Sequence, residues 1–254
     1  MRFLARPVLL LLLMTVAACA AGYEGMSRSF NGKEARLRFK TVLIAGDASI
    51  AVFDRATAAV RDRLNARGAT VDVVRFTSHP AVAAREGAVM ASLDSVLGTI
   101  GQLRPGRGQG CLVYATSHGA FEQGLVFAAS REFLTPNALD VALRLGCGDA
   151  PTVVVISGCF SGTFVEPPMR RPNRIVLTAA RADRTSFGCG AEFDYTVYDK
   201  CFLRALDEAE TWREAHTMIQ GCVARREQEQ GFSPPSGPRA WLGPEVAGLP
   251  MPGQ

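Results

Sequence analysis

The sequence predicts an α/β fold with a mostly parallel central sheet covered by helices on both faces. Two observations support this prediction: short β-branched runs alternate along the chain with segments whose apolar residues recur at helical spacing. Strands separated by helices are joined by right-handed crossovers, which produce a parallel sheet with helices on either side. The 254 residues suit one such domain with extensions, and an apolar fraction of 48% is typical of a globular chain.

In the first half of the chain, regular structure begins with a buried strand over 39–45 that ends at Gly46. A helix follows over 51–67, and Gly68 is a natural C-cap for it. Alternating residues then predict a strand over 70–76, and an apolar stripe predicts one helix over 82–100.

The second half repeats the alternation after a break at 105–108. Pro136 is favourable in the first turn of a helix, and residues 174–178 form a further apolar, β-branched run. The elements predicted here are strands over 111–115, 152–156 and 174–178, and helices over 136–145, 195–206 and 212–227. Six prolines follow Phe232, and we expect this segment to lie on the surface or to be loose.

The N-terminus has the pattern of an export signal. Arg2 and Arg6 provide positive charge, residues 8–14 form an apolar core, and small residues 16–18 precede Cys19. This segment is too short for a comfortable transmembrane helix. It resembles the bacterial lipoprotein signal, in which the cysteine is lipidated and becomes the new N-terminus.

That resemblance implies a signal peptide over 1–18, lipidation of Cys19 and a tether over 19–38. Ala20 provides no inner-membrane retention signal, so the implied location is the cell envelope, anchored in the outer membrane and facing the periplasm. The alternative is a plain secretory signal that is cleaved near Ala18 or Ala21.

Two predicted strands end in residues that can carry nucleophilic chemistry. The run 152–156 leads to Cys159, which has glycine on one side and small residues nearby, and the run 111–115 leads to His118 and Gly119. Carboxyl ends of parallel strands meet at one edge of a sheet, where open α/β folds place their sites. A thiol and an imidazole at that edge predict a Cys/His nucleophilic site. His79 and His216 lie in a polar loop and inside a helical stretch, and we expect structural roles for them.

The residues around these two positions resemble a known family. Tyr114-Ala115-Thr116-Ser117-His118-Gly119 with Gly124-Leu125-Val126-Phe127, and Ser157-Gly158-Cys159-Phe160-Ser161-Gly162, are similar to the histidine and nucleophile motifs of the legumain-like C13 cysteine peptidases. Residues 176–180 and 184–189 resemble the next stretch of that family. The resemblance extends over roughly 41–206 and points to a compact bacterial branch, because the short Pro-rich tail leaves no room for a legumain-type C-terminal pro-domain.

This resemblance implies a caspase-like, three-layer αβα domain over 39–232, followed by a Pro-rich tail over 233–254. It also implies a cysteine endopeptidase with a Cys159/His118 dyad acting on peptide or protein substrates without metal or cofactor. The backbone N–H groups of Gly119 and Cys159 would receive the oxyanion. Residues at positions similar to the family's substrate pocket are Arg55, Ser157, Glu192 and Asp194.

The chain departs from the family at two positions. Legumains have an acidic residue two positions before the nucleophile, where this chain has Ser157, and commonly an aspartate before the histidine, where this chain has Ser117. Specificity for asparagine is therefore not implied. Two alternatives use the same fold: a transpeptidase or ligase whose acyl-enzyme is intercepted by an amine, and a non-catalytic envelope lipoprotein that serves as a binding module.

The remaining cysteines and the charge limit other functions. Apart from Cys19 and Cys159 there are five cysteines, and an oxidising compartment favours two disulfides and one free thiol. Among these, Cys189, Cys201 and Cys222 are the first place to look for a bridge. The sequence contains no CxxC or CxH pair of the kind that would predict a zinc site.

The net charge of +4 comes almost wholly from arginine. Because the chain has no run of basic residues interleaved with aromatic residues, nucleic acid is not an expected partner.

Overall fold

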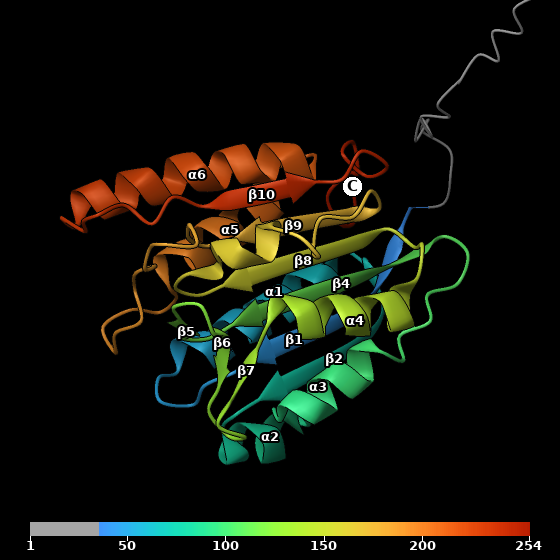
Figure 1. Ribbon diagram of the computed structural model, residues 1–254, viewed down its shortest axis with the longest axis horizontal. Coiled ribbons are helices and arrows are strands. Elements are labelled where there is room, and N and C mark those ends of the chain that lie inside the picture. The colour runs from blue at the N-terminus through green and yellow to red at the C-terminus, as the bar shows by residue number, and fades with distance from the viewer. Residues whose placement is uncertain (1–35) are drawn as a thin grey trace, which may run out of the picture.

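The computed structural model describes residues 36–254 and has a central sheet between two layers of helices (Figure 1). The predicted signal peptide, Cys19 and nearly all of the tether lie outside the described residues. The strands of the central sheet are β1 (Arg38–Ala45), β2 (Thr70–Thr77), β3 (Val89–Met90), β4 (Gln109–Thr116), β8 (Thr152–Ser157), β9 (Arg174–Thr178) and β10 (Arg239–Leu242).

The helices follow the alternation that the sequence predicts, with one difference described below. They are α1 (Val52–Ala66), α2 (Pro80–Glu86), α3 (Leu93–Ile100), α4 (Pro136–Cys147), α5 (Val197–Glu208) and α6 (Trp212–Glu229), and a short 3₁₀ turn, η1 (Ser161–Val165), follows β8. Thr135, Thr196 and Thr211 cap α4, α5 and α6 by accepting a hydrogen bond from a backbone N–H of the first turn.

The strand order is β10-β9-β8-β4-β1-β2-β3, and every pair is parallel except β10 with β9. The chain builds outward from β1 in one direction to β2 and β3, then returns to the other side of β1 with β4, β8 and β9. The order therefore reverses between β1 and β4, and loops diverge at the carboxyl ends of these strands. This topology confirms the predicted α/β class with a mostly parallel sheet.

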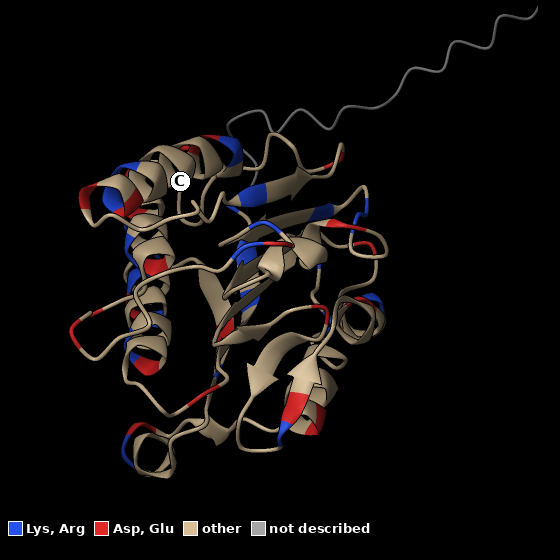
Figure 2. Ribbon diagram, turned by 60° about the vertical axis from the view of Figure 1, so that its left-hand side comes forward, with Lys and Arg blue, Asp and Glu red and all other residues tan. Residues whose placement is uncertain are grey.

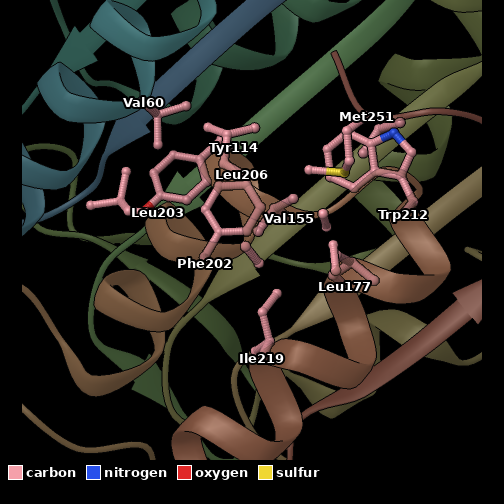
Figure 3. Packing of buried hydrophobic residues seen from close by; sticks show 14 of the residues in the cluster. Val60, Tyr114, Val155, Leu177, Phe202, Leu203, Leu206, Trp212, Ile219 and Met251 are labelled. Atoms are coloured by element: carbon pink, nitrogen blue, oxygen red, sulfur yellow. The ribbon is translucent and has the colours of Figure 1, made fainter. Parts of the chain in front are cut away.

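Alternate residues of each central strand face the two helical layers. In β4, Leu112 and Tyr114 pack in the cluster formed with α1, α5 and α6, whereas Val113 and Ala115 pack in the cluster formed with α3 and α4. Figure 3 shows the first cluster, in which the ring of Phe202 lies between Tyr114 and Val155. Burial on both faces explains why these strands are continuously apolar rather than alternating.

The predicted helix over 82–100 is wrong, because the structure divides it into α2, β3 and α3. Gly87 adopts a left-handed conformation (φ 64°) and ends α2, and Ser92 begins α3 with a capping box that it shares with Ser95. The stripe is divided between elements: Leu93, Val96, Leu97 and Ile100 belong to α3 and pack in the cluster with α4, whereas Val89 lies on β3 and is exposed.

The Pro-rich C-terminal segment also differs from the expected surface or loose tail. Residues 239–242 form β10, which pairs with β9 at the edge of the sheet, and Leu249 and Met251 are buried in the core beside α6. The folded domain therefore continues past residue 232. Prolines do not prevent this arrangement, because β10 is an edge strand and has no proline among its four residues.

A second, three-stranded sheet was not predicted. It consists of β5 (Gly119–Ala120), β6 (Gly124–Phe127) and β7 (Glu132–Leu134), which follow directly after β4. All of its pairs are antiparallel. It begins one residue after His118 and so covers one side of the carboxyl edge of the main sheet.

Two disulfides and one further free thiol are present, as the cysteine count predicted. Cys111 is bonded to Cys147 and Cys201 to Cys222, which leaves Cys189 unpaired besides Cys159 among the described residues. Basic and acidic residues are interspersed over the helices (Figure 2). Within residues 36–254, no helix combines the length and the apolar character that crossing a bilayer requires.

Candidate active site

The register of β4 and β8 brings the turns that carry His118 and Cys159 to the same edge of the sheet. Thr116 at the end of β4 pairs with Ser157 at the end of β8, in parallel. Neighbouring strands lie about 5 Å apart. His118 and Cys159 each follow two residues after this pair, so the two turns leave the sheet edge together.

The two turns are packed directly against each other. Ser117 N–H donates to Ser157 O at 3.1 Å, which continues the β4–β8 ladder beyond the strands. A Cβ on Gly119 would overlap the carbonyl oxygen of Cys159, and a Cβ on Gly158 would meet the Leu125 side chain and Ser117 O. Only glycine allows this close approach, so the small residues noted in the sequence are what bring the turns together.

His118 is supported by the start of α1 and by the small sheet. The ring of Phe53 meets the imidazole edge to face, with centroids 5.2 Å apart and an interplanar angle of 88°. The His118 carbonyl accepts Val126 N–H at 2.8 Å, which ties its backbone to β6. Phe53 is fully buried, so the imidazole has a rigid apolar wall on one side.

Cys159 is half-buried and lies against the loop that follows β9. Its Sγ accepts the N–H of Ser186 at 3.3 Å and lies 3.6 Å from Ser186 O. A second bond, from Phe160 N–H to Arg184 O at 2.7 Å, joins the same two segments. The nucleophile turn is thus attached to the 184–189 loop on one side and to Gly119 on the other.

The backbone N–H of Cys159 is available to a ligand. Within residues 36–254, it donates to no acceptor of the protein, although its neighbour Phe160 does. Phe160 has a left-handed conformation (φ 58°), which turns the chain sharply after the nucleophile. A bare N–H next to a nucleophile is the donor type that stabilises an oxyanion.

A buried acidic side chain lies beneath the end of β4. Asp199, at the start of α5, is fully buried and accepts hydrogen bonds from the hydroxyls of Tyr114 at 2.6 Å and Thr116 at 2.9 Å. Burial raises the pKa of Asp199, and hydrogen bonds from polar neighbours, Tyr114 first among them, oppose that rise. One side chain therefore ties the end of β4 to the start of α5.

Ser157 lies in the core at the end of β8. It was predicted to contact substrate, and it is only 2% exposed. The reason is the alternation of β8: the position two residues before Cys159 still belongs to the strand and faces the α5 layer.

Arg55, Glu192 and Asp194 do meet at the same edge of the molecule. Arg55 on α1 donates to the carbonyls of Asp194 at 2.8 Å and Phe193 at 2.5 Å, so its guanidinium holds this loop through its backbone. Glu192 and Asp194 are exposed, and the Glu192 carboxylate lies over Gly190. The structure thus brings Arg55 and the 192–194 loop together, with the acidic side chains facing solvent.

The second free thiol, Cys189, lies on the loop between Ser186 and Glu192. Burial raises its pKa to about 12, and the charge of Cys159 and that of Asp199 add to this effect. It packs with Phe53 and Phe193 in a small apolar cluster next to Ala45. Cys189 is therefore a protonated, inert side chain near neutral pH.

Sequence reasoning missed Phe53, Ser186 and Asp199. Ser186 lies within the stretch 184–189 that carries the family resemblance, so its neighbourhood was detectable, but its contact with Cys159 was not.

The other two histidines lie on other elements of the fold. His79 is exposed at the start of α2, and His216 on α6 has a pKa lowered to about 4 by burial and by Arg239. Among the described residues, no cluster of His, Cys, Asp and Glu is arranged to hold a metal ion.

Comparison with known sequences identifies the family. Residues 94–242, from α3 to β10, match the model of the peptidase C13 family. The chain belongs to the peptidase C13 family. Among curated proteins, no sequence matches the chain. Membership of this cysteine-peptidase family implies a peptide or protein substrate, and the matched range contains both His118 and Cys159.

Proposed function

We propose that this C13-family chain is a cysteine endopeptidase of the cell envelope, with Cys159 as nucleophile and His118 as general acid and base. The observation that carries the proposal is the parallel register of β4 and β8, which delivers both residues two positions beyond the Thr116–Ser157 pair. Packing of a hydrophobic core does not require a thiol and an imidazole on adjoining, glycine-containing turns. Nucleophilic catalysis does require both groups within reach of each other.

The Cys159 thiolate attacks the carbonyl carbon of the scissile peptide bond. The tetrahedral intermediate collapses, the C–N bond breaks, and the acyl group remains on Sγ as a thioester. His118 gives its proton to the leaving amine and then takes a proton from the water that attacks the thioester. The second tetrahedral intermediate collapses, the C–S bond breaks, and the acid product leaves with the Cys159 thiolate and the protonated His118 regenerated.

The N–H groups of Cys159 and Gly119 stabilise the oxyanion in both steps. Support for this role is that the Cys159 N–H has no acceptor within the described residues and that Gly119 lies against the Cys159 carbonyl. Losing one such donor typically costs about 3 kcal/mol of transition-state stabilisation.

The acyl side of the substrate lies along the loop that carries Ser186 and the acidic residues Glu192 and Asp194. The support for this placement is that Ser186 contacts Sγ, the atom to which the substrate carbonyl becomes bonded. Arg55 has its Nε–H and one Nη–H committed to loop carbonyls, and we assign it the role of holding the pocket wall.

The test is covalent labelling with a peptidyl acyloxymethyl ketone, read by intact mass. We expect wild-type protein to gain one adduct on Cys159, Cys159→Ala to gain none, and His118→Ala to react at least about tenfold more slowly. Circular dichroism of each variant serves as the control for folding. A panel of side chains at the position before the reactive carbon reports which residue the acyl-side pocket accepts.

Two results would contradict the proposal. Labelling that persists in Cys159→Ala would assign the reaction to another residue. A folded wild-type protein that neither labels nor cleaves peptides under reducing conditions would support a binding module on this fold instead.

We also propose that the protein is attached to the outer membrane through a lipid on Cys19. The support is the sequence alone: two arginines, an apolar core and small residues before the cysteine. Cys19→Ala should move the protein from the membrane fraction to the soluble fraction of cells, and the mass of the wild-type N-terminal peptide should include the lipid. If the mature wild type carries no lipid and fractionates as Cys19→Ala does, the segment is a plain secretory signal.

A further inference from the structure

Phe121 is an exposed aromatic residue beside the candidate nucleophile. It lies at the turn between β5 and β6, and 53% of its surface is accessible. Its ring meets that of Phe160 edge to face, with centroids 5.4 Å apart and an interplanar angle of 75°. Phe160 directly follows Cys159, so the two rings form an apolar surface that begins one residue after the nucleophile in the chain.

Both rings of this aromatic pair, Phe121 and Phe160, are carried by well-bonded backbone. The turn that bears Phe121 is closed by a hydrogen bond from Gln123 N–H to Ala120 O at 3.1 Å. The hairpin is anchored at its base by the Ser117 hydroxyl, which donates to Val126 O at 2.8 Å. These hydrogen bonds hold the aromatic pair in place before any ligand binds. A substrate side chain that binds the pair therefore loses little free energy to the ordering of loops.

The position of the pair relative to His118 identifies the part of the substrate that it meets. His118 must protonate the leaving amine, so the leaving-group side of the substrate begins next to the imidazole. The chain runs from His118 through β5 to Phe121, at most about 10 Å for three residues of extended chain. An extended substrate covers the same distance in its first three leaving-side residues.

We propose that Phe121 and Phe160 bind an aromatic or large aliphatic side chain within the first residues on the leaving-group side of the substrate. This inference rests on the proposed function, because it uses His118 as the acid. The exposed Glu122 next to Phe121 adds selectivity, since its charge opposes an acidic substrate residue at this place. The Phe121–Phe160 pair thus selects the substrate residues on the leaving-group side of the cleaved bond, whereas the 184–194 loop selects those on the acyl side.

The test compares two peptides that are identical up to the cleaved bond and carry either phenylalanine or serine at the first two leaving-side positions. Binding is measured by fluorescence anisotropy in the Cys159→Ala background, so that the result does not depend on turnover. Turnover is measured in otherwise wild-type protein. The variants are Phe121→Ala, the conservative Phe121→Tyr, and Leu145→Ala as a matched control, because Leu145 is an exposed apolar residue on α4.

We expect the phenylalanine peptide to be preferred by about fivefold, and Phe121→Ala to remove that preference. Phe121→Tyr and Leu145→Ala should keep it, and labelling by an electrophile without leaving-side residues should be unchanged in Phe121→Ala. The inference is overturned if the Cys159→Ala protein shows no preference, or if the preference survives in Phe121→Ala. Failure of the proposed function is a separate result, namely loss of labelling and cleavage in the wild type.

Discussion

At the level of single residues, glycine and buried polar groups determine the chemistry at the carboxyl edge of the main sheet, where β4 and β8 end. Gly119 and Gly158 let the turns after β4 and β8 pack on one another, so that the backbone segments carrying His118 and Cys159 lie together. Asp199 then fixes the strand ends from below through Tyr114 and Thr116. The two free thiols of the described residues are both half-buried but differ in their neighbours, since Cys159 accepts a hydrogen bond from Ser186 while Cys189 packs against a small apolar cluster.

Cys189 should resist alkylation in the folded protein. With a pKa of about 12 instead of 9.0, its thiolate fraction near neutral pH is about a thousandfold below that of an unshifted thiol. In Cys159→Ala, iodoacetamide should modify Cys189 at least about a hundredfold more slowly in native than in urea-unfolded protein, as measured by peptide mass. Equal rates in the two states would show that the thiol is accessible and not desolvated.

Replacing Asp199 by asparagine should change how stability depends on pH. Burial raises the pKa of Asp199 above 3.8, so the folded state holds its proton more tightly than the unfolded state. Its contribution to stability is complete below that value and is lost as pH rises through the raised pKa. Relative to Asp199→Asn, wild type should therefore lose unfolding free energy as the pH rises from about 4 towards neutrality.

Urea unfolding at several pH values measures this difference. Asp149→Asn is the matched control, because Asp149 is exposed, and its curve should run parallel to that of wild type. A difference between wild type and Asp199→Asn that stays constant, or that moves in favour of wild type with rising pH, would mean that Asp199 is not protonated preferentially in the folded state.

At the level of elements, local signals located most strands and helices, and tertiary pairing decided the others. Pro136, Gly68 and the apolar runs are read correctly from sequence because each acts within one turn or one strand. The stripe over 82–100 could not be divided by periodicity alone, because the turn at Gly87 and the cap at Ser92 that separate α2, β3 and α3 leave the spacing of the apolar residues unchanged. β10 was missed because an edge strand of four residues has almost no periodic signal.

The disulfide between Cys201 and Cys222 should stabilise the pair α5–α6. It joins residues 21 positions apart, for which loss of unfolded-state entropy corresponds to about 3 kcal/mol. We expect the double replacement of these cysteines by alanine to lower the unfolding free energy by about that amount in urea. Cys189→Ala, which breaks no bond, should lower it by less than about 1 kcal/mol. A similar loss in both would point to packing rather than the cross-link.

At the level of the whole molecule, the C-terminal segment completes the core. The helical layer formed by α1, α5 and α6 is closed by residues from the last part of the chain, namely Trp212 and Met251 (Figure 3) together with Leu249 in the same cluster. β10 adds the outermost strand beside β9, and the family match also extends to residue 242. The Pro-rich composition was therefore a poor guide to the role of this segment.

Met251→Ala should be strongly destabilising. Met251 is 1% exposed in the core cluster that also contains Trp212, and removing such a side chain typically costs about 2–5 kcal/mol. Met90→Ala is the matched control, because Met90 is 40% exposed at the edge strand β3 and should cost less than about 1 kcal/mol. If both variants unfold at the same urea concentration, the C-terminal segment does not contribute to the cooperative core.

The sequence by itself determined the α/β class, the parallel sheet, the two strand ends that carry His118 and Cys159, and the number of disulfides. These follow from short-range patterns: apolar runs, small residues at their ends, and a count of thiols. Only the tertiary structure decided that Asp199 holds Tyr114 and Thr116, that Ser186 reaches the sulfur, and that Phe121 packs against Phe160. Those contacts join residues from separate elements, and their partners depend on strand register and crossover, which no local pattern specifies.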